Sequence, residues 1–554
     1  MTKVQPFVGT QTANITSIRL RLFAAACVCL LGLAATACDE DDSQIAIDPD
    51  ASVTQDSGTV EPRDSGIDSS TPDLSTPDLG DAGVDDLDTG VGDLDAGDQN
   101  IIVLGARRAF PSASGAGSIT TGGRGGRVIH VTNLDDSGSG SFREALLATG
   151  PRFVVFDVSG RINLNSRIEL IAENSDLTIA GETAPEGGIT ISGKPLLLAG
   201  GYDRATSSTD NVIIRHVRFR NGSYTGEADA FDHNGIISGG SDRFVFDHLS
   251  FSFNDDQALS LAPFFAPLQD GTIQRCIFSE NATGIIVGNQ SAQYLDGTNR
   301  ISTLQNLFVH QGHRTPNLAL NGRADIINNV LFSWGSRLTN INGGNGEVNF
   351  IGNHLTAGSE YAPGAGQDNK VQAPATPTVY TANNFHSVLY PTPQLDDRGL
   401  WTNFSSSEAL PDARFTTTQH PLLAATVVMT ATQAWTRVLA DVGTNAFVSD
   451  SGVSGRYLDT YDTLRIQDVR DEISRNPFNK VWTQPVLPTN TRSGDFYGGL
   501  SDIPAFFATA HAITSNDQVL ASYQFDGYRV QNDAGYSALE MYLFFAAGDF
   551  DRAR

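Results

Sequence analysis

Cysteine and basic residues are both scarce in this sequence. Four cysteines in 554 residues are too few for a disulfide scaffold. Lys and Arg number 36 against 63 Asp and Glu, which gives a formal net charge of −27 at pH 7. Nucleic-acid binding needs basic patches that neutralise phosphates, so we expect no nucleic-acid partner. Helical periodicity is nearly absent between residues 170 and 390, which argues against a helical solenoid there.

Only one long apolar run is present, at residues 22–37, directly after two arginines. It is shorter than the roughly 20 residues of a membrane span and resembles the core of a signal peptide. Residues 35–38 resemble a bacterial lipoprotein cleavage box, in which Cys38 becomes the lipidated first residue. Ordinary secretion and a true membrane anchor are the alternatives. We therefore expect residues 1–38 to be a signal peptide of the lipoprotein type. The protein would then be exported, as a lipoprotein of the cell surface or outer membrane or as a secreted protein.

Most of the negative charge lies in residues 39–100, which hold 19 Asp and Glu and one basic residue, Arg63. Pro, Gly, Ser and Asp dominate this segment, and it contains no aromatic residue. Such a composition cannot bury enough apolar area to offset the entropy lost on ordering. The spacing and closing Glu of an EF-hand calcium loop are absent. Residues 39–100 are therefore predicted to be a disordered, Asp-rich linker.

An imperfect repeat of short β-type runs fills residues 170–390. Aligned apolar positions recur in steps of 32, 27, 31, 23, 24 and 31 residues, and Gly, Asn and Asp separate the runs. A period of this size with strands in each repeat indicates a β-solenoid. We therefore predict an all-β fold, a right-handed parallel β-helix. The repeat anchors are Val217, Leu249, Cys276, Leu307, Val330, His354 and Phe385.

Asparagine occupies one position of four successive repeats, directly before the apolar anchor. Stacked asparagines at a bend can hydrogen-bond one another and tolerate a left-handed backbone. We predict a structural ladder at Asn306, Asn329, Asn353 and Asn384, and none of these residues is a catalytic candidate. Cys276 is predicted to be a small buried hydrophobe.

Five stretches in order along the chain resemble the polysaccharide lyase family that contains pectate lyases. They begin with AFPSASGAGSITTGGRGGRVIHVTNLDDSGSGSFREAL and continue with GPRFVVFDVSGRINL and LTIAGETAPEGGITISG. The strand VFDHLSFSFNDDQALSL and the loop QGHRTPNL follow, with a weaker match at DAGYSALEMYL. The family is a parallel β-helix, in agreement with the repeat. The resemblance implies a lyase that acts on an acidic, polygalacturonate-like polysaccharide.

The resemblance also implies a mechanism and a metal. A pectate lyase removes the C5 proton beside a uronate carboxylate, so the site must stabilise a second developing negative charge. Calcium supplies that charge, and hard oxygen ligands suit it. Carried over from the family's motifs, the calcium ligands are Asp229 and Asp256, with Asp255 as a helper. A turn between strands that Asp255 and Asp256 merely cap is the alternative.

The family's catalytic base is an Arg two residues before a Pro, which corresponds to Arg314 here. Guanidinium stays protonated to about pH 12 or above. The alternative is therefore that Arg314 acts as an electrostatic clamp while His313 or His310 takes the proton. A solvated loop cation is the structural alternative.

The sequence departs from the family at three positions. Ser260 replaces a third acidic ligand, Ala319 replaces a basic residue, and residues 279–291 lack the expected Lys. Arg323, Arg337 or Lys370 could substitute for the missing cations. These losses keep two alternatives open: a non-catalytic glycan-binding or adhesive β-helix of the cell surface, and a lyase for another uronate polymer.

Four segments result. The signal peptide and the linker are followed by a pectate-lyase-like β-helix over residues 101–395. Residues 396–554 are predicted to form an extension of loops and helices packed on the β-helix, because 410–445 and 530–547 have helical character. We expect a monomer whose contact with the membrane is only through the lipid anchor.

Overall fold

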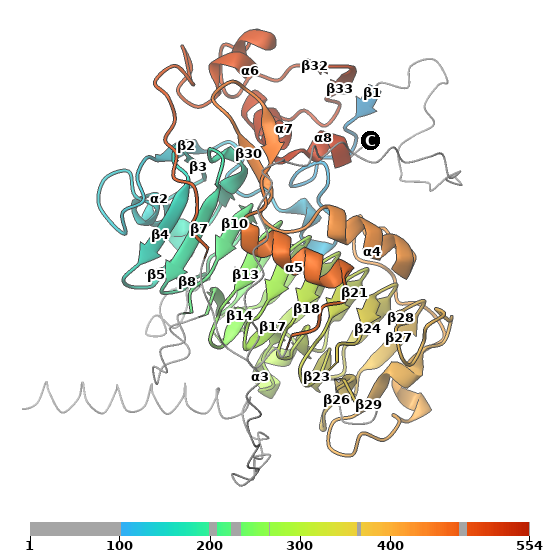
Figure 1. The fold of residues 1–554 in the computed structure, drawn as a ribbon. Coiled ribbons are helices and arrows are strands. Elements are labelled where there is room, and N and C mark those ends of the chain that lie inside the picture. Colours follow the sequence, from blue (N-terminus) through green and yellow to red (C-terminus); the bar gives the residue numbers. More distant parts are fainter. Residues whose placement is uncertain are drawn as a thin grey trace, which may run out of the picture. The chain divides into compact units, whose positions relative to one another are not determined.

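The computed structural model describes residues 101–198, 208–222, 234–264, 266–359, 361–362, 367–475 and 485–552. The signal peptide and linker predicted over residues 1–100 lie outside the described residues. Between Arg127 and Asn403 the chain winds through three parallel sheets in turn, which makes a parallel β-helix of about nine turns. The predicted fold class is therefore confirmed. Figure 1 shows the coils stacked one upon the next.

Each coil contributes one strand to each sheet, because short apolar runs alternate with residues that turn the chain. Sheet 1 contains β2 Arg127–Val131, β3 Arg152–Phe156, β6 Leu177–Ala180, β9 Val212–Arg215, β12 Ser241–Asp247, β15 Leu268–Gln274, β18 Thr298–Leu304, β21 Arg323–Ile327, β24 Glu347–Ile351 and β27 Thr378–Ala382. Sheet 2 contains β4 Gly160–Leu164, β7 Ile189–Gly193, β10 Val217–Phe219, β13 Ser250–Ser252, β16 Ile277–Ser279, β19 Leu307–Val309, β22 Val330–Phe332, β25 His354–Thr356 and β28 Phe385–His386. Sheet 3 contains β5 Ile168–Glu169, β8 Leu196–Leu197, β11 Ile236–Ser238, β14 Gln257–Leu261, β17 Thr283–Gly288, β20 Asn317–Ala319, β23 Asn340–Gly343, β26 Asn369–Val371 and β29 Trp401–Asn403.

The core of the β-helix is a continuous column of apolar side chains. Phenylalanines at one position of four successive coils stack with ring centroids 4.9 to 5.5 Å apart. Burial of such rings is the main term that stabilises a solenoid, since each coil covers the apolar face of its neighbour. The stacked residues are Phe219, Phe251, Phe278 and Phe308.

The predicted asparagine ladder is confirmed. The Nδ2 of Asn306 donates to Oδ1 of Asn329 at 3.0 Å, and the same contact joins Asn329 to Asn353 and Asn353 to Asn384. The carboxylate of Asp397 ends the column by accepting from Asn384 at 2.9 Å. All of these side chains are buried.

The predicted anchor alignment is wrong by one residue at one step. Leu307 pairs with Ile277, so the residue level with Cys276 is Asn306. Cys276 therefore occupies the ladder column, and Oδ1 of Asn306 accepts from its backbone N–H at 2.9 Å. The side chain is fully buried, as expected, and burial raises the pKa of its thiol.

Outside the coils, helices and short strands complete the fold. Two helices of the C-terminal part, α4 and α5, lie along one side of the coils (Figure 1), where Val438, Leu439, Ile466 and Val469 pack against sheet 2. Among the residues described, none of the helices combines the length and apolarity needed to span a bilayer. The remaining elements are β1 Ile101–Val103, α2 Phe142–Leu147, α3 Ala292–Leu295, α4 Ala431–Ala440, β30 Ala446–Val448, β31 Ser454–Arg456, α5 Thr460–Arg470, α6 Ala505–Ala510, β32 Ser522–Phe525, β33 Tyr528–Gln531, α7 Ala538–Ala547 and α8 Asp549–Arg552.

Candidate functional site

The predicted site residues that the structure describes lie at the N-terminal ends of the strands of sheet 3. We call this row of strand ends the leading edge, or simply the edge, of sheet 3. Asp255 and Asp256 precede β14, and His313 and Arg314 precede β20. The coil between them begins its strand β17 at Thr283. Since β17 pairs with β14 on one side and β20 on the other, the two predicted groups are neighbours across a single strand.

Backbone hydrogen bonds of the middle coil fix this arrangement. The N–H of Thr283 donates to the carbonyl of Asp256 at 3.0 Å. The N–H groups of Gly284 and Ile285 donate to the carbonyls of His313 and Arg314 at 2.9 and 2.8 Å. Two strand spacings put the backbones of Asp256 and Arg314 about 10 Å apart.

The two acidic residues provide oxygen donors at one end of this edge. Asp255 and Asp256 are half-buried, and the side-chain amide of Gln257 donates to the Asp256 carboxylate. Calcium takes oxygen ligands, carboxylates among them, so these two donors fit the ion. Asp229, the other predicted ligand, lies outside the described residues. Gly222 and Asn234 are the described residues on either side of that segment, and both adjoin the Asp255–Asp256 turn.

His313 and Arg314 lie on the same edge, two strands away from Asp255 and Asp256. Arg314 is 5% exposed and has a left-handed backbone with φ 66°. Burial, together with the positive charges of Arg314 and Arg337, holds the pKa of His313 well below its usual range. The imidazole is therefore neutral at neutral pH, which makes it an acceptor of low basicity. His310 cannot take the proton, because it is buried and its Nε2 lies 3.3 Å from Asp468 on α5.

Two of the three proposed substitute cations lie further along the same edge. Arg337 is on the corresponding turn of the next coil, and its guanidinium lies 5.1 Å from the ring centroid of Phe404. Lys370 is the middle residue of β26, the next strand of sheet 3, and its Nζ lies 2.7 Å from Oγ1 of Thr402. The pKa of Lys370 is lowered, because burial and the positive charge of Arg337 outweigh the opposite effect of the Asp368 carboxylate. Arg323 is instead on sheet 1, paired with Glu347 at 2.5 Å, so it cannot serve as a clamp here.

A separate group of potential metal ligands occurs at the bend between sheets 1 and 2. Within the described ranges it is the one set of three or more His, Cys, Asp or Glu side chains that could hold an ion, and it consists of His216, Asp247 and His248. All three are buried, and the two imidazole rings stack at 4.7 Å with an interplanar angle of 18°. Two ring nitrogens cannot both point at one ion from parallel stacked planes. Asp247 is also occupied by Arg215 at 2.9 Å. We interpret the group as structural.

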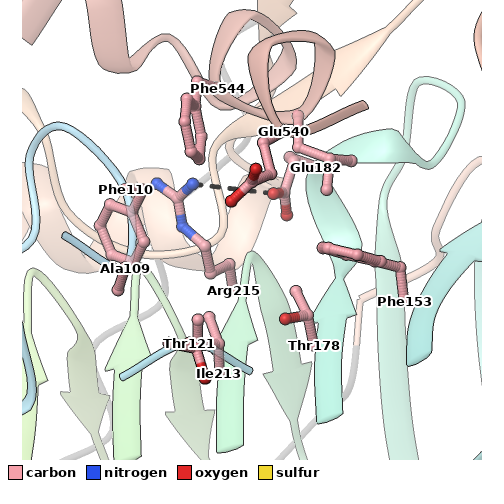
Figure 2. Close-up of a pocket in the computed structure, with 11 residues that line it drawn as sticks. Ala109, Phe110, Thr121, Phe153, Thr178, Glu182, Ile213, Arg215, Glu540 and Phe544 are labelled. Atoms are coloured by element: carbon pink, nitrogen blue, oxygen red, sulfur yellow. Dashed lines mark ion pairs between the residues drawn. The ribbon is translucent and has the colours of Figure 1, made fainter. Parts of the chain in front are cut away.

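A small cavity of about 20 Å³, room for roughly one water, lies where α7 covers sheet 1. Figure 2 shows Arg215 reaching toward Glu182 across it, with their charged atoms 3.7 Å apart. Burial raises the pKa of Glu182 to about 7. Arg215 also binds Asp549 of α8 at 2.9 Å. Of the predicted site residues that the structure describes, none lines this cavity. The ion pair between Arg215 and Asp549 links the coils to the C-terminal helices here.

One set of residues behind the site was not predicted. Asn254, Asn281 and Gln311 directly precede the site segments of three coils and are linked by their side-chain amides. The spacings of 27 and 30 residues between them fit the repeat, so the signal was present in the sequence. It was obscured because the last member is Gln rather than Asn.

Comparison with known proteins gives sequence relatives over part of the chain. No family model matches the chain. It is 35% identical over 253 residues to "probable pectate lyase C" of Aspergillus fumigatus, and 36% identical over 253 residues to the protein of that name from Aspergillus oryzae. Each match covers 45% of this chain and 54% of the relative. The chain therefore spans about half the length of the curated relatives it matches.

The comparison with solved structures matches more of the chain, at lower identity. A pectate lyase from Bacillus sp. N165 in complex with trigalacturonate matches 60% of this chain and 98% of its own, with a TM-score of 0.44 and 16% identity. Jun a 1, the major allergen from cedar pollen, matches 60% of this chain and 92% of its own, with a TM-score of 0.40 and 16% identity. The resemblance inferred from the sequence is confirmed by the sequence relatives: over about 250 residues this chain is similar to proteins named probable pectate lyase.

Proposed function

We propose that this protein is a polysaccharide lyase that cleaves a pectate-like polyuronate by calcium-assisted β-elimination. The observation that carries the proposal is the order of charges along one edge of sheet 3. Asp255 and Asp256 lie at one end, His313 and Arg314 lie two strands away, and Arg337 and Lys370 follow. A linear polyanion laid along this edge would meet carboxylates first and then a row of cations.

In the proposed reaction the C5 proton passes to a base, and its electron pair forms the C4–C5 double bond. The C4–O bond breaks, and the leaving oxygen takes up a proton. Calcium, held by Asp256 and Asp255 with Asp229 as a further ligand, would supply positive charge beside the reacting uronate carboxylate. Arg314 would hold positive charge where the enolate-like charge develops, or act as the base itself. His313, neutral and adjacent, is the alternative base.

Calcium dependence is the first expected result. Removal of the ion by a chelator should reduce turnover of polygalacturonate by at least about 100-fold, because the developing charge loses its largest stabilising partner. Added calcium should restore turnover. Asp256→Asn should raise the calcium concentration needed for half-maximal activity at least about tenfold, since one full ligand charge is lost. The assay follows unsaturated uronate by ultraviolet absorbance. Turnover that a chelator leaves unchanged would contradict the role of calcium.

Arg337 is expected to bind substrate rather than to react. It occupies the edge one coil beyond Arg314, and the family's basic residue is replaced by Ala319. Arg337→Ala should therefore raise KM for polygalacturonate about tenfold and change kcat less than about threefold. Steady-state kinetics at saturating calcium measure both constants. A fall in kcat with KM unchanged would place Arg337 in the chemical step instead.

A non-catalytic glycan-binding β-helix is the second candidate. Ser260 stands where the family has a third acidic residue, which reduces the negative charge available for calcium. The alignment of Asp256 and Arg314 on one edge favours the enzyme. Binding of polygalacturonate without turnover would favour the second candidate, and turnover of only a different uronate polymer would indicate another lyase.

We also propose that the protein is exported, either tethered through a lipid on Cys38 or secreted, and acts as a monomer. The apolar run at residues 22–37 and the cleavage box at residues 35–38 support the export. Metabolic labelling of expressing cells with a fatty acid should label the wild-type protein and leave Cys38→Ala unlabelled. A wild-type protein without label would contradict the lipid tether and leave secretion.

A further inference from the structure

Three consecutive coils enter the site segments through residues in a left-handed conformation. Phe253, Glu280 and His310 have φ values of 65°, 50° and 50°, and each directly follows a strand of sheet 2. This conformation is unfavourable for side chains with a Cβ atom unless surrounding contacts hold it. We call these residues the corner residues. Asp256 lies three positions after Phe253, and Arg314 lies four positions after His310.

Helix α5 contacts every one of the corner residues. The ring of Tyr461 lies 4.6 Å from that of Phe253, and its hydroxyl donates to Oε2 of Glu280 at 2.5 Å. Arg465 donates to the same Glu280 carboxylate at 2.9 Å. The Nε2 of His310 lies 3.3 Å from Oδ2 of the third helix residue, Asp468.

The spacing of the three helix residues explains how one element serves three coils. Tyr461, Arg465 and Asp468 are four and three positions apart, so they lie on one face of α5. All three are buried. Arg465 also binds Asp468 at 2.9 Å, so the contacts form one connected chain along the helix.

The buried amides next to the corners join the three coils to one another. Nδ2 of Asn254 donates to Oδ1 of Asn281 at 2.7 Å, and Nδ2 of Asn281 donates to Oε1 of Gln311 at 3.1 Å. Gln311 donates in turn to the backbone carbonyl of Asn281 at 2.9 Å. We call these three residues the amide column. A shift of one corner would therefore be passed to the next coil.

We infer that α5 is a positioning element of the site, which fixes the separation of Asp256 and Arg314 through the corner residues and the amide column. The inference rests on the proposed function of that site. The three helix residues contact the coils at the corner residues, so they are positioning residues and do not touch substrate. A misplacement of about 1 Å at a reacting group can reduce turnover about 100-fold, so a remote helix can control kcat.

Two variants of the full chain test the inference against a matched control. Asp468→Asn weakens the hold on His310, and Tyr461→Phe removes one hydroxyl and keeps the ring against Phe253. Thr463→Ala, on the exposed face of the same helix, is the control. We expect Asp468→Asn to lower kcat on polygalacturonate about tenfold with KM within twofold, and Tyr461→Phe to lower it about threefold. The control should behave as wild type.

Hydrogen exchange of three amides gives a second readout that does not depend on activity. The N–H groups of Thr283, Gly284 and Ile285 donate to Asp256, His313 and Arg314, so their exchange reports whether the site segments stay joined. Exchange should be about tenfold faster in Asp468→Asn than in the control, well below the unfolding temperature. A lower unfolding temperature with unchanged kcat and exchange would show that α5 only stabilises the fold, and would overturn the inference. If wild type turns over no uronate, the proposed function fails, and exchange alone decides the role of α5. Tyr461→Phe decides it if Asp468→Asn does not fold.

Discussion

Arg314→Ala is expected to lower kcat on polygalacturonate by about 10² to 10³, which is the typical effect of removing one group that stabilises developing charge. The hydrogen bond from the N–H of Ile285 to the carbonyl of residue 314 should persist in this variant, because it does not involve the side chain. Arg314→Lys should recover only part of the loss. Lysine keeps the charge but lacks the planar, bidentate guanidinium.

The matched control for this prediction is Arg323→Ala. Arg323 is also an arginine of a coil, but it pairs with Glu347 on sheet 1, away from the site edge. Its replacement should leave kcat and KM within about twofold of wild type, since exposed ion pairs contribute little. Equal losses in both variants would point to a general effect of charge. Full turnover by Arg314→Ala would remove Arg314 from catalysis.

Gly284→Ala is expected to abolish most activity, although the substitution adds only one methyl group. Gly284 is in β17, the strand between the two halves of the site. A Cβ atom there would lie 2.5 Å from the carbonyl oxygen of Arg314, closer than carbon and oxygen can approach. The backbone of Arg314 must therefore move away from β17. We expect kcat to fall at least about 100-fold, the cost of misplacing a reacting group.

Gly297→Ala is the control for Gly284→Ala. At Gly297 a Cβ atom would have its nearest neighbours at 3.5 Å, an ordinary van der Waals distance. This variant should keep wild-type kinetics and stability. Activity of Gly284→Ala near that of Gly297→Ala would show that the position of Arg314 is not critical for turnover.

The repeat made the fold predictable from the sequence. Short apolar runs at intervals of 23 to 32 residues predicted a parallel β-helix, and the asparagines before the anchors predicted their own ladder. The alignment failed at the step from Cys276 to Leu307. Val217, Leu249 and Cys276 share the column of the asparagine ladder, whereas Leu307 is level with Ile277. A buried thiol and a buried aliphatic side chain are both small and apolar, so residue type alone could not fix the register.

The site was predictable only in part, and the missing part depends on long-range contacts. The family motifs pointed to Asp256 and Arg314, and the structure has both residues at one edge of sheet 3, because sequence position within a coil determines position along the sheet. They did not reveal that His310 faces Asp468, or that Arg337 rather than Arg323 lies beside Arg314. Asp468 is 158 residues from His310, and neither the repeat nor the motifs extend into α5.

The products formed from polygalacturonate test the central claim most directly. The full-length protein, incubated with the polymer and calcium, should yield oligouronates with an unsaturated end, each one water lighter by mass spectrometry than the corresponding hydrolysis product. The same incubation with Arg314→Ala should yield almost none. Intact polymer recovered bound to the wild-type protein, or saturated products alone, would contradict β-elimination and with it the function proposed for the edge of sheet 3.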